Sequence, residues 1–179
     1  MAEPSGYHFI KKEAMQKHQI TDTTLNILLA DDDKDDCLFF KEALEEIPIA
    51  TSLTTVNDGE QLMQHLETVT ENLPHIIFLD LNMPRKNGFE CLAQIKNQSV
   101  YKNLHVIIYS TSYNEEKANL LFNSGAQYYI CKPSDFNELK KVVHQAIILV
   151  KRNDDQISKE NFCINKPKNR FLTKTNSKV

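Results

Sequence analysis

The sequence lacks the features that would place a protein in or across a membrane. No stretch approaches the roughly 18 consecutive apolar residues that a membrane-spanning helix needs. The N-terminus also lacks the apolar core that secretory signal peptides contain. We therefore expect a cytoplasmic protein that has no membrane partner.

Cysteine is scarce, and its positions form no metal-binding or redox motif. The cysteines are Cys37, Cys91, Cys131 and Cys163. None belongs to a CxxC pair, and no histidine stands at metal-ligand spacing from them. The first three fall within apolar helix or strand patterns, which predicts small core residues in a reduced, cytoplasmic setting.

A surplus of positive charge is missing, and so is the length for a second domain. The formal net charge is −3 at pH 7, which gives no general case for binding nucleic acid or a membrane surface. A chain of 179 residues corresponds to one domain with tails. We expect a polar N-terminal tail over 1–24, one folded domain over 25–152 and a basic tail over 153–179, with no nucleic-acid-binding domain.

The basic C-terminal tail allows two interpretations. The simpler one is a polar tail that is exposed to solvent. Phe162, Ile164 and the pair Phe171-Leu172 would also allow docking on a partner or on a second copy of the domain. The sequence leaves both interpretations open.

Apolar runs and amphipathic segments alternate along the central part of the chain. We expect strands at 25–30, 53–56, 75–80, 105–109 and 127–131, and helices at 33–47, 60–68, 89–96, 115–123 and 136–152. Such alternation with short connections predicts an α/β fold with a parallel sheet covered on both faces, because parallel strands need a crossover, usually a helix.

The stretch from His75 to Pro84 is the centre of this pattern. Its apolar run predicts a strand buried on both faces, and Pro84 stops the strand because proline cannot donate to a ladder. Asp80 then stands at the carboxyl end of the strand, the edge where open α/β sheets bind ligands. Taken alone, an aspartate there can equally cap the next turn.

The other strands end in residues that complement Asp80. The first ends in Asp31-Asp32, the fourth in Ser110 and the fifth in Lys132. Carboxylates about 4 Å apart repel by roughly 4 kcal/mol at an effective dielectric constant near 20, and a hard divalent cation removes that repulsion. The set therefore predicts a Mg²⁺ site made of three carboxylates and a backbone carbonyl.

This set suits phosphoryl transfer to a carboxylate. Asp80 would be the nucleophile, and Mg²⁺ would neutralise the charge that develops on the phosphoryl group. Lys132 and Ser110 would hold the remaining phosphoryl oxygens. Each of these residues alone could have an ordinary structural role. Their joint occurrence at the ends of successive strands is hard to explain by chance.

The motifs together resemble the CheY-like receiver domain of response regulators in two-component signalling. They are Leu29 to Asp33, Leu79 to Pro84 with Gly88, Tyr109 to Thr111, and Lys132-Pro133. The resemblance covers about 25–152. It implies a flavodoxin-like (βα)5 three-layer sandwich whose parallel five-stranded sheet has the order 2-1-3-4-5.

The resemblance also implies roles for single residues. Asp80 would accept the phosphoryl group from a histidine kinase or a phosphotransfer protein. Asp31, Asp32, Asp80 and the carbonyl of Asn82 would hold Mg²⁺. Lys132 would bind the phosphoryl group.

A switch is implied as well. Ser110 would move toward the phosphoryl group and Tyr129 would fill the vacated space, with Thr111 narrowing access in place of a smaller residue. The bond before Pro133 would be cis. The face that changes would consist of the fourth helix (115–123), the fifth strand (127–131) and the fifth helix (136–152), and it would bind a downstream protein target.

The tail and the lack of a further domain are similar to stand-alone regulators paired with bacterial phytochrome kinases. That similarity implies a phytochrome-type kinase as partner. It leaves room for a homodimer through helix four, strand five, helix five and the C-terminal tail.

Two other functions are consistent with parts of the pattern. A phosphatase of the haloacid dehalogenase class also uses a strand-end aspartate with Mg²⁺, but it needs a second aspartate where this chain has Asn82. A receiver-like scaffold would bind partners without phosphorylation and would not need the complete set of site residues. Covalent phosphate that persists on Asp80 would distinguish both from a phosphoacceptor.

Overall fold

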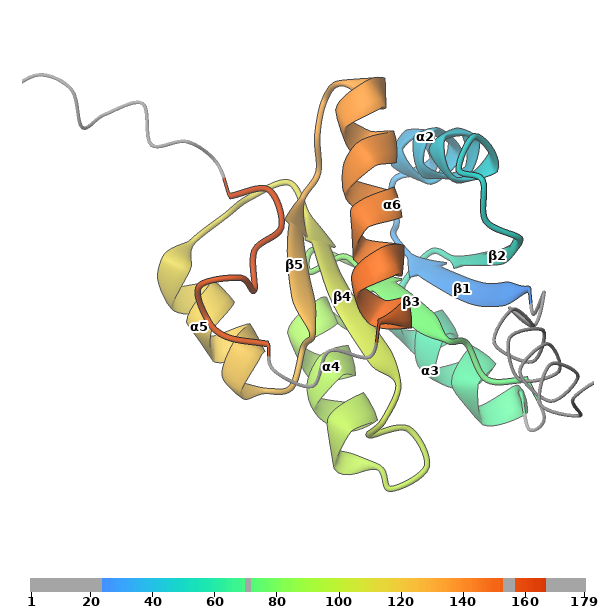
Figure 1. Cartoon of the computed structure of the whole chain (residues 1–179). Helices are drawn as coiled ribbons and strands as arrows, with labels where there is room; N and C mark the ends of the chain where they lie inside the picture. Colours follow the sequence, from blue (N-terminus) through green and yellow to red (C-terminus); the bar gives the residue numbers. More distant parts are fainter. Residues whose placement is uncertain (1–23, 70–71, 153–156, 167–179) are drawn as a thin grey trace, which may run out of the picture.

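The computed structural model describes residues 24–69, 72–152 and 157–166 (Figure 1). The strands are β1 (Leu25–Ala30), β2 (Thr51–Val56), β3 (Ile76–Leu79), β4 (His105–Ser110) and β5 (Tyr128–Cys131). The helices are α2 (Lys34–Glu45), α3 (Gly59–Thr68), α4 (Gly88–Asn97), α5 (Glu115–Asn123) and α6 (Phe136–Lys151). The predicted N-terminal tail lies outside the described residues, except for Thr24.

The strands form one parallel sheet in the order β2-β1-β3-β4-β5. This confirms the predicted fold class and strand order. β2 begins two residues earlier than the apolar pattern indicated, because Thr51 pairs with Leu25 at the start of β1. These polar residues become strand through pairing with β1, which no local pattern indicates.

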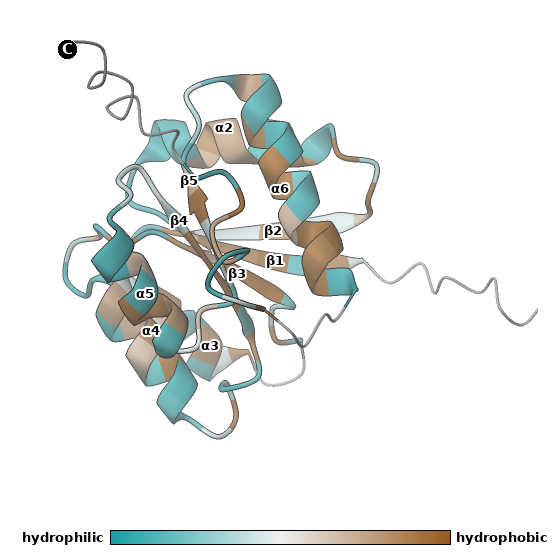
Figure 2. Cartoon of the chain, turned by 60° about the vertical axis from the view of Figure 1, so that its left-hand side comes forward, coloured by the Kyte–Doolittle hydropathy of each residue, from teal (hydrophilic) through white to brown (hydrophobic). Residues whose placement is uncertain are grey.

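The sheet is covered on both faces, which makes three layers (Figures 1 and 2). One face packs against α3, α4 and α5, and the other against α2 and α6. All residues of β3 are buried, so the strand is shielded by both helix layers as its apolar run predicted. Among the cysteines, Cys91 and Cys131 are buried as expected, while Cys37 is partly exposed.

Helix caps fix where several of these helices begin and end. Asp33 caps α2 by accepting hydrogen bonds from the N–H groups of Asp35 and Asp36. Asn114 caps α5 in the same way. Gly125 follows α5 with φ of 90°, a conformation that favours glycine. None of the described helices is long and apolar enough to cross a membrane.

Part of the basic C-terminal tail is packed against the domain. Residues 157–166 run beside β5 and over α5, shown in red in Figure 1. Phe162 is buried among the side chains of the α3–α4–α5 layer. Residues 157–166 thus pack on their own domain, with Phe162 buried and Ser158 to Asn161 exposed, an arrangement that neither interpretation of the tail named.

Candidate functional site

The predicted site residues follow the carboxyl ends of four neighbouring strands. The backbone continues the ladder at this edge, because Asp31 N–H donates to Val56 O and Asp80 N–H donates to Ala30 O. In the same way, Lys132 N–H donates to Ser110 O over 2.8 Å. These bonds place the side chains at one end of the sheet.

Three carboxylates converge there. Asp31, Asp32 and Asp80 each offer an oxygen, and these atoms lie within 4.8 Å of one another. Asp31 is fully buried and Asp80 nearly so, whereas Asp32 is exposed. The cluster is thus closed on the protein side and open to solvent at Asp32.

Lys132 lies within reach of the same cluster. Its Nζ is 2.7 Å from Asp31 Oδ2, 2.8 Å from Asp36 Oδ2 and 3.6 Å from Asp80 Oδ2. The Lys132 side chain is 6% exposed, and its Nζ lies 5.2 Å from the centre of the Tyr109 ring. The ammonium is therefore held among carboxylates at the mouth of the sheet.

Sequence reasoning missed Asp36. In the sequence this residue stands in the first turn of α2, where an acidic side chain is already explained by the helix dipole. The structure adds a hydrogen bond from Lys132 Nζ. Helical spacing puts Asp36 on the same side of α2 as Phe40, which packs against the sheet, and this was the available signal.

Burial and charge act against each other in the pKa values of this site. Burial raises the pKa of Asp31 to about 6, although Lys132 acts to lower it. Burial likewise raises the pKa of Asp80. For Lys132, burial alone would lower the pKa, but its bonds to Asp31 and Asp36 outweigh burial and raise it.

The donor set fits a divalent cation. The carboxylates of Asp31, Asp36 and Asp80 lie around one ammonium and Asp32 adds a fourth carboxylate, so negative charge is in excess when all are ionised. Hard oxygen donors, one of them open to solvent, suit an ion that keeps some of its water. Asn82 is also exposed, beside Asp80, and its N–H acts to lower the pKa of that carboxyl.

The loop after Asp80 holds that carboxylate in a fixed orientation. Leu81 N–H donates to Asp80 Oδ1 over 2.7 Å. Gly88 N–H then donates to Leu81 O, and a Cβ at Gly88 would lie 2.2 Å from the carbonyl oxygen of Asp80. Only glycine allows the start of α4 to approach the site this closely.

The predicted switch residues lie beside the site. Ser110 is fully buried, and its Oγ has no hydrogen bond of acceptable geometry. Tyr129 is 1% exposed, and its hydroxyl donates to Ser112 O. Burial raises the pKa of Tyr129 to about 12, with the nearby Ser110 hydroxyl acting to lower it. Thr111 is exposed.

One expectation for this edge is wrong. No cis peptide bond occurs among the described residues, so the bond between Lys132 and Pro133 is trans. For a bond before proline, trans is favoured by about 0.5–1 kcal/mol, a difference small enough that context decides the isomer.

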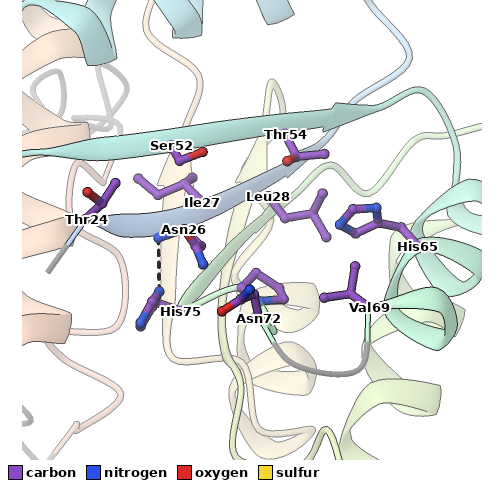
Figure 3. Close-up of a pocket in the computed structure, with 11 residues that line it drawn as sticks. Thr24, Asn26, Ile27, Leu28, Ser52, Thr54, His65, Val69, Asn72 and His75 are labelled. Carbon is purple, nitrogen blue, oxygen red and sulfur yellow. Dashed lines mark hydrogen bonds between the residues drawn. The ribbon is translucent and has the colours of Figure 1, made fainter.

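A separate cavity lies near the amino ends of the strands (Figure 3). It measures about 740 Å³, and Asn26, Thr54, His65 and His75 are among its lining residues. Asn26 N–H donates to His75 Nδ1 over 2.9 Å. The described lining residues include no carboxylate, whereas the acidic cluster brings three of them together.

The fold and this constellation define a class: a flavodoxin-like domain with an acidic, lysine-containing site at the carboxyl edge of its sheet. The model of the protein family described as "Response regulator receiver domain" matches residues 27–144 of the chain. The chain belongs to this family, and it is a signalling phosphoacceptor of two-component systems.

Relatives share the fold and much of the length. The response regulator Rcp1 from Synechocystis is 33% identical over 121 residues, 65% of this chain and 82% of that protein. The structure of the phosphorylated cyanobacterial phytochrome response regulator RcpA is 30% identical, covers 73% of this chain and 96% of its own, and superposes with a TM-score of 0.66. The Mn²⁺-bound form of Rcp1 is 32% identical, with 68% and 90% coverage and a TM-score of 0.62.

Proposed function

We propose that Asp80 accepts a phosphoryl group from a phosphohistidine of a histidine kinase or phosphotransfer protein. A bond forms between an Asp80 carboxylate oxygen and phosphorus, the bond between phosphorus and the histidine nitrogen breaks, and the imidazole leaves. The observation that carries this proposal is the ammonium of Lys132 held among Asp31, Asp36 and Asp80. It stands ready to bind a phosphoryl oxygen on Asp80.

Mg²⁺ is the cation that we propose for the site. Asp31, Asp32, Asp80 and the backbone carbonyl of Asn82 would hold it, and when bound it neutralises charge on the transferring phosphoryl group. Asp31 and Asp80 are fixed by the ends of β1 and β3, so their carboxylates need little rearrangement. Ser110 would donate its hydroxyl to a phosphoryl oxygen.

The test is incubation with acetyl phosphate and Mg²⁺, followed by intact mass and a phosphate-affinity gel. We expect one added phosphoryl group in the wild type, and none with EDTA or in Asp80→Asn. Asp35→Asn is the matched control, because Asp35 is an exposed aspartate in the first turn of α2. Labelled phosphate entering Asp80→Asn would move the acceptor elsewhere.

The phosphorylation-independent scaffold is the alternative that this experiment must exclude. If acetyl phosphate adds no mass, the next donors are phosphorylated histidine kinases. Wild type that stays unmodified with every donor, yet still binds a partner, would support the scaffold.

For the donor we propose a phytochrome-type histidine kinase. The support is the similarity to Rcp1 and to RcpA, described as a cyanobacterial phytochrome response regulator. Transfer from such a kinase should be faster than transfer from histidine kinases of other sensor classes at equal concentration. Equal rates from all kinases would contradict the assignment.

The proposed output is a change in the face made of α5, β5 and α6, which would bind a downstream protein. The packed residues 157–166 cover the β5 edge of this face, so a partner or a second copy would meet that segment first. Sedimentation with and without phosphorylation tests the homodimer. An unchanged monomer under both conditions would contradict it.

A further inference from the structure

Residues 157–166, here called the C-terminal strap, extend the sheet beyond β5. Tyr129 N–H donates to Phe162 O over 2.8 Å, and Ile164 N–H donates to Tyr129 O over 2.9 Å. These two bonds form a parallel bridge, so the strap pairs with Tyr129 as a short additional strand would. The backbone of the predicted switch aromatic is thereby fixed on both sides.

A side chain completes the pairing one step further along β5. The amide oxygen of Asn165 accepts from Cys131 N–H over 2.9 Å, and its amide nitrogen donates to Cys131 O over 2.8 Å. The strap is thus hydrogen-bonded to the last part of β5, directly before Lys132.

The ring of Phe162 packs edge-on against the ring of Tyr129. It is 3% exposed, with its centroid 6.2 Å from that of Tyr129 and 5.4 Å from that of Phe122 in α5. Tyr113 packs edge-on against Tyr129 as well, at 5.6 Å. Aromatic pairs of this kind stabilise a buried ring beyond the area that they bury.

A charged contact joins the end of the strap to Glu115, the first residue of α5. Lys166 Nζ lies 3.4 Å from Glu115 Oε1 and 5.4 Å from the centre of the Tyr113 ring. These side chains are exposed, and exposed pairs contribute little stability. Phe162 is therefore the strap side chain that holds the ring of Tyr129, while the backbone of the strap holds the Tyr129 backbone.

We propose that Phe162 is a positioning residue of the phosphorylation switch, because it holds Tyr129 in a buried place, which is the place that the predicted switch assigns to this ring when Asp80 is phosphorylated. The inference rests on the proposed phosphoacceptor function. Since the backbone of Tyr129 is fixed by the strap, the ring can leave only by side-chain rotation. Rotation outward breaks the hydroxyl bond to Ser112 O and exposes Phe162.

The physical consequence is reciprocal coupling. A docked strap favours the arrangement that the phosphorylated state needs, so it should favour phosphorylation of Asp80. By linkage, phosphorylation should tighten the strap to the same degree. Residues outside the acidic cluster thus become part of the switch.

The first test compares phosphorylation rates of full-length variants with acetyl phosphate and Mg²⁺. Phe162→Ala should lower the rate about fivefold or more, because a smaller fraction of the protein then holds Tyr129 in the competent arrangement. Phe162→Leu keeps most of the apolar volume over Tyr129 and should restore most of the rate. The matched control is Phe39→Ala, since Phe39 is a half-buried aromatic that packs against Phe136 in the other helix layer.

The second test measures hydrogen exchange at the Ile164 amide. In the wild type, phosphorylation should slow exchange, and in Asp80→Asn the phosphoryl donor should leave it unchanged. In Phe162→Ala exchange should be fast with or without phosphorylation. A purely structural role would leave the wild-type amide equally protected in both states and would overturn the proposal.

A third measurement needs no phosphorylation. Tyrosine labelled with ¹³C at Cζ gives one signal for Tyr129, identified by its loss in Tyr129→Phe. Phe162→Ala should shift this signal toward the solvent-exposed position, whereas Phe162→Leu should leave it close to its wild-type position. If no donor phosphorylates the wild type, the proposed function fails and this signal still decides the inference. An unshifted signal, or a wild-type phosphorylation rate in Phe162→Ala, would overturn it.

Discussion

Lys132 donates a hydrogen bond to Asp36 over 2.8 Å, and so joins the end of β5 to the first turn of α2, 96 residues earlier in the chain. The same ammonium lies 2.7 Å from Asp31 Oδ2. The Lys132 ammonium therefore connects the ends of β5 and β1 with the first turn of α2. Removing Lys132 or one of its partners should change the stability of the whole site.

Asp36→Ala should lower the free energy of unfolding by about 0.5–1 kcal/mol, a small loss because its side chain is 38% exposed and solvent screens the pair. Asp35→Ala is the matched control, since Asp35 lies in the same turn of α2 without a bond to Lys132. A double-mutant cycle with Lys132→Ala, followed by urea unfolding, measures the coupling. A coupling energy near zero would contradict the role of Asp36.

Lys132→Ala should destabilise the protein by about 3 kcal/mol in EDTA, because it leaves the buried carboxylate of Asp31 without its cation. Added Mg²⁺ should restore part of that loss, since the ion supplies positive charge at the same carboxylates. Lys140→Ala removes a surface pair with Glu46 and serves as the control. A free energy of unfolding of Lys132→Ala that does not change with Mg²⁺ would argue against Mg²⁺ and Lys132 acting on the same carboxylates.

Mg²⁺ affinity should fall as the pH drops below about 6, because the pKa of Asp31 is raised to about 6 and a proton then competes with the ion. Calorimetric titration at pH 7.5 and at pH 5 measures the difference, expected to be up to about tenfold per pH unit. Affinity that is equal at both values would mean that Asp31 does not ligate.

The same raised pKa has a consequence for stability without metal. The folded state holds the proton of Asp31 up to about pH 6, whereas the unfolded chain releases it near 3.8, so the contribution of Asp31 to stability falls as the pH rises between these values. Asp31→Asn should remove that fall, and in EDTA at pH 7 it should raise the free energy of unfolding by on the order of 1–2 kcal/mol. Thermal unfolding at several pH values provides the measurement, and a lower melting temperature for Asp31→Asn at pH 7 would contradict the sign.

Gly88→Ala should destabilise the fold by more than about 2 kcal/mol, because its Cβ would lie 2.2 Å from the carbonyl oxygen of Asp80. Gly125→Ala is the comparison: its Cβ would meet only the Lys96 side chain at 3.4 Å, and the strain comes from the φ of 90°. That change should cost about 1 kcal/mol. Equal losses would show that the contact with Asp80 O relaxes easily.

Much of this protein follows from local sequence. The apolar run before Asp80 predicted β3 because a strand shielded on both faces needs apolar residues throughout. The alternation of strands and helices predicted the parallel sheet, and a parallel sheet brings its carboxyl ends to one edge. Asp31, Asp32, Asp80, Ser110 and Lys132 could therefore be grouped without coordinates.

Other features were decided by tertiary structure. Asp36 had a sufficient local explanation as a helix N-terminal acid, and only the approach of Lys132 gave it a second role. The apolar residues of the C-terminal strap, such as Phe162 and Ile164, allowed docking, but the sequence did not show on which surface. The strap docks because β5 is an edge strand whose Tyr129 backbone pairs with it, and because Phe122 and Tyr129 form a place for one phenyl ring. Such contacts depend on distant residues meeting, and no periodicity of the segment itself encodes them.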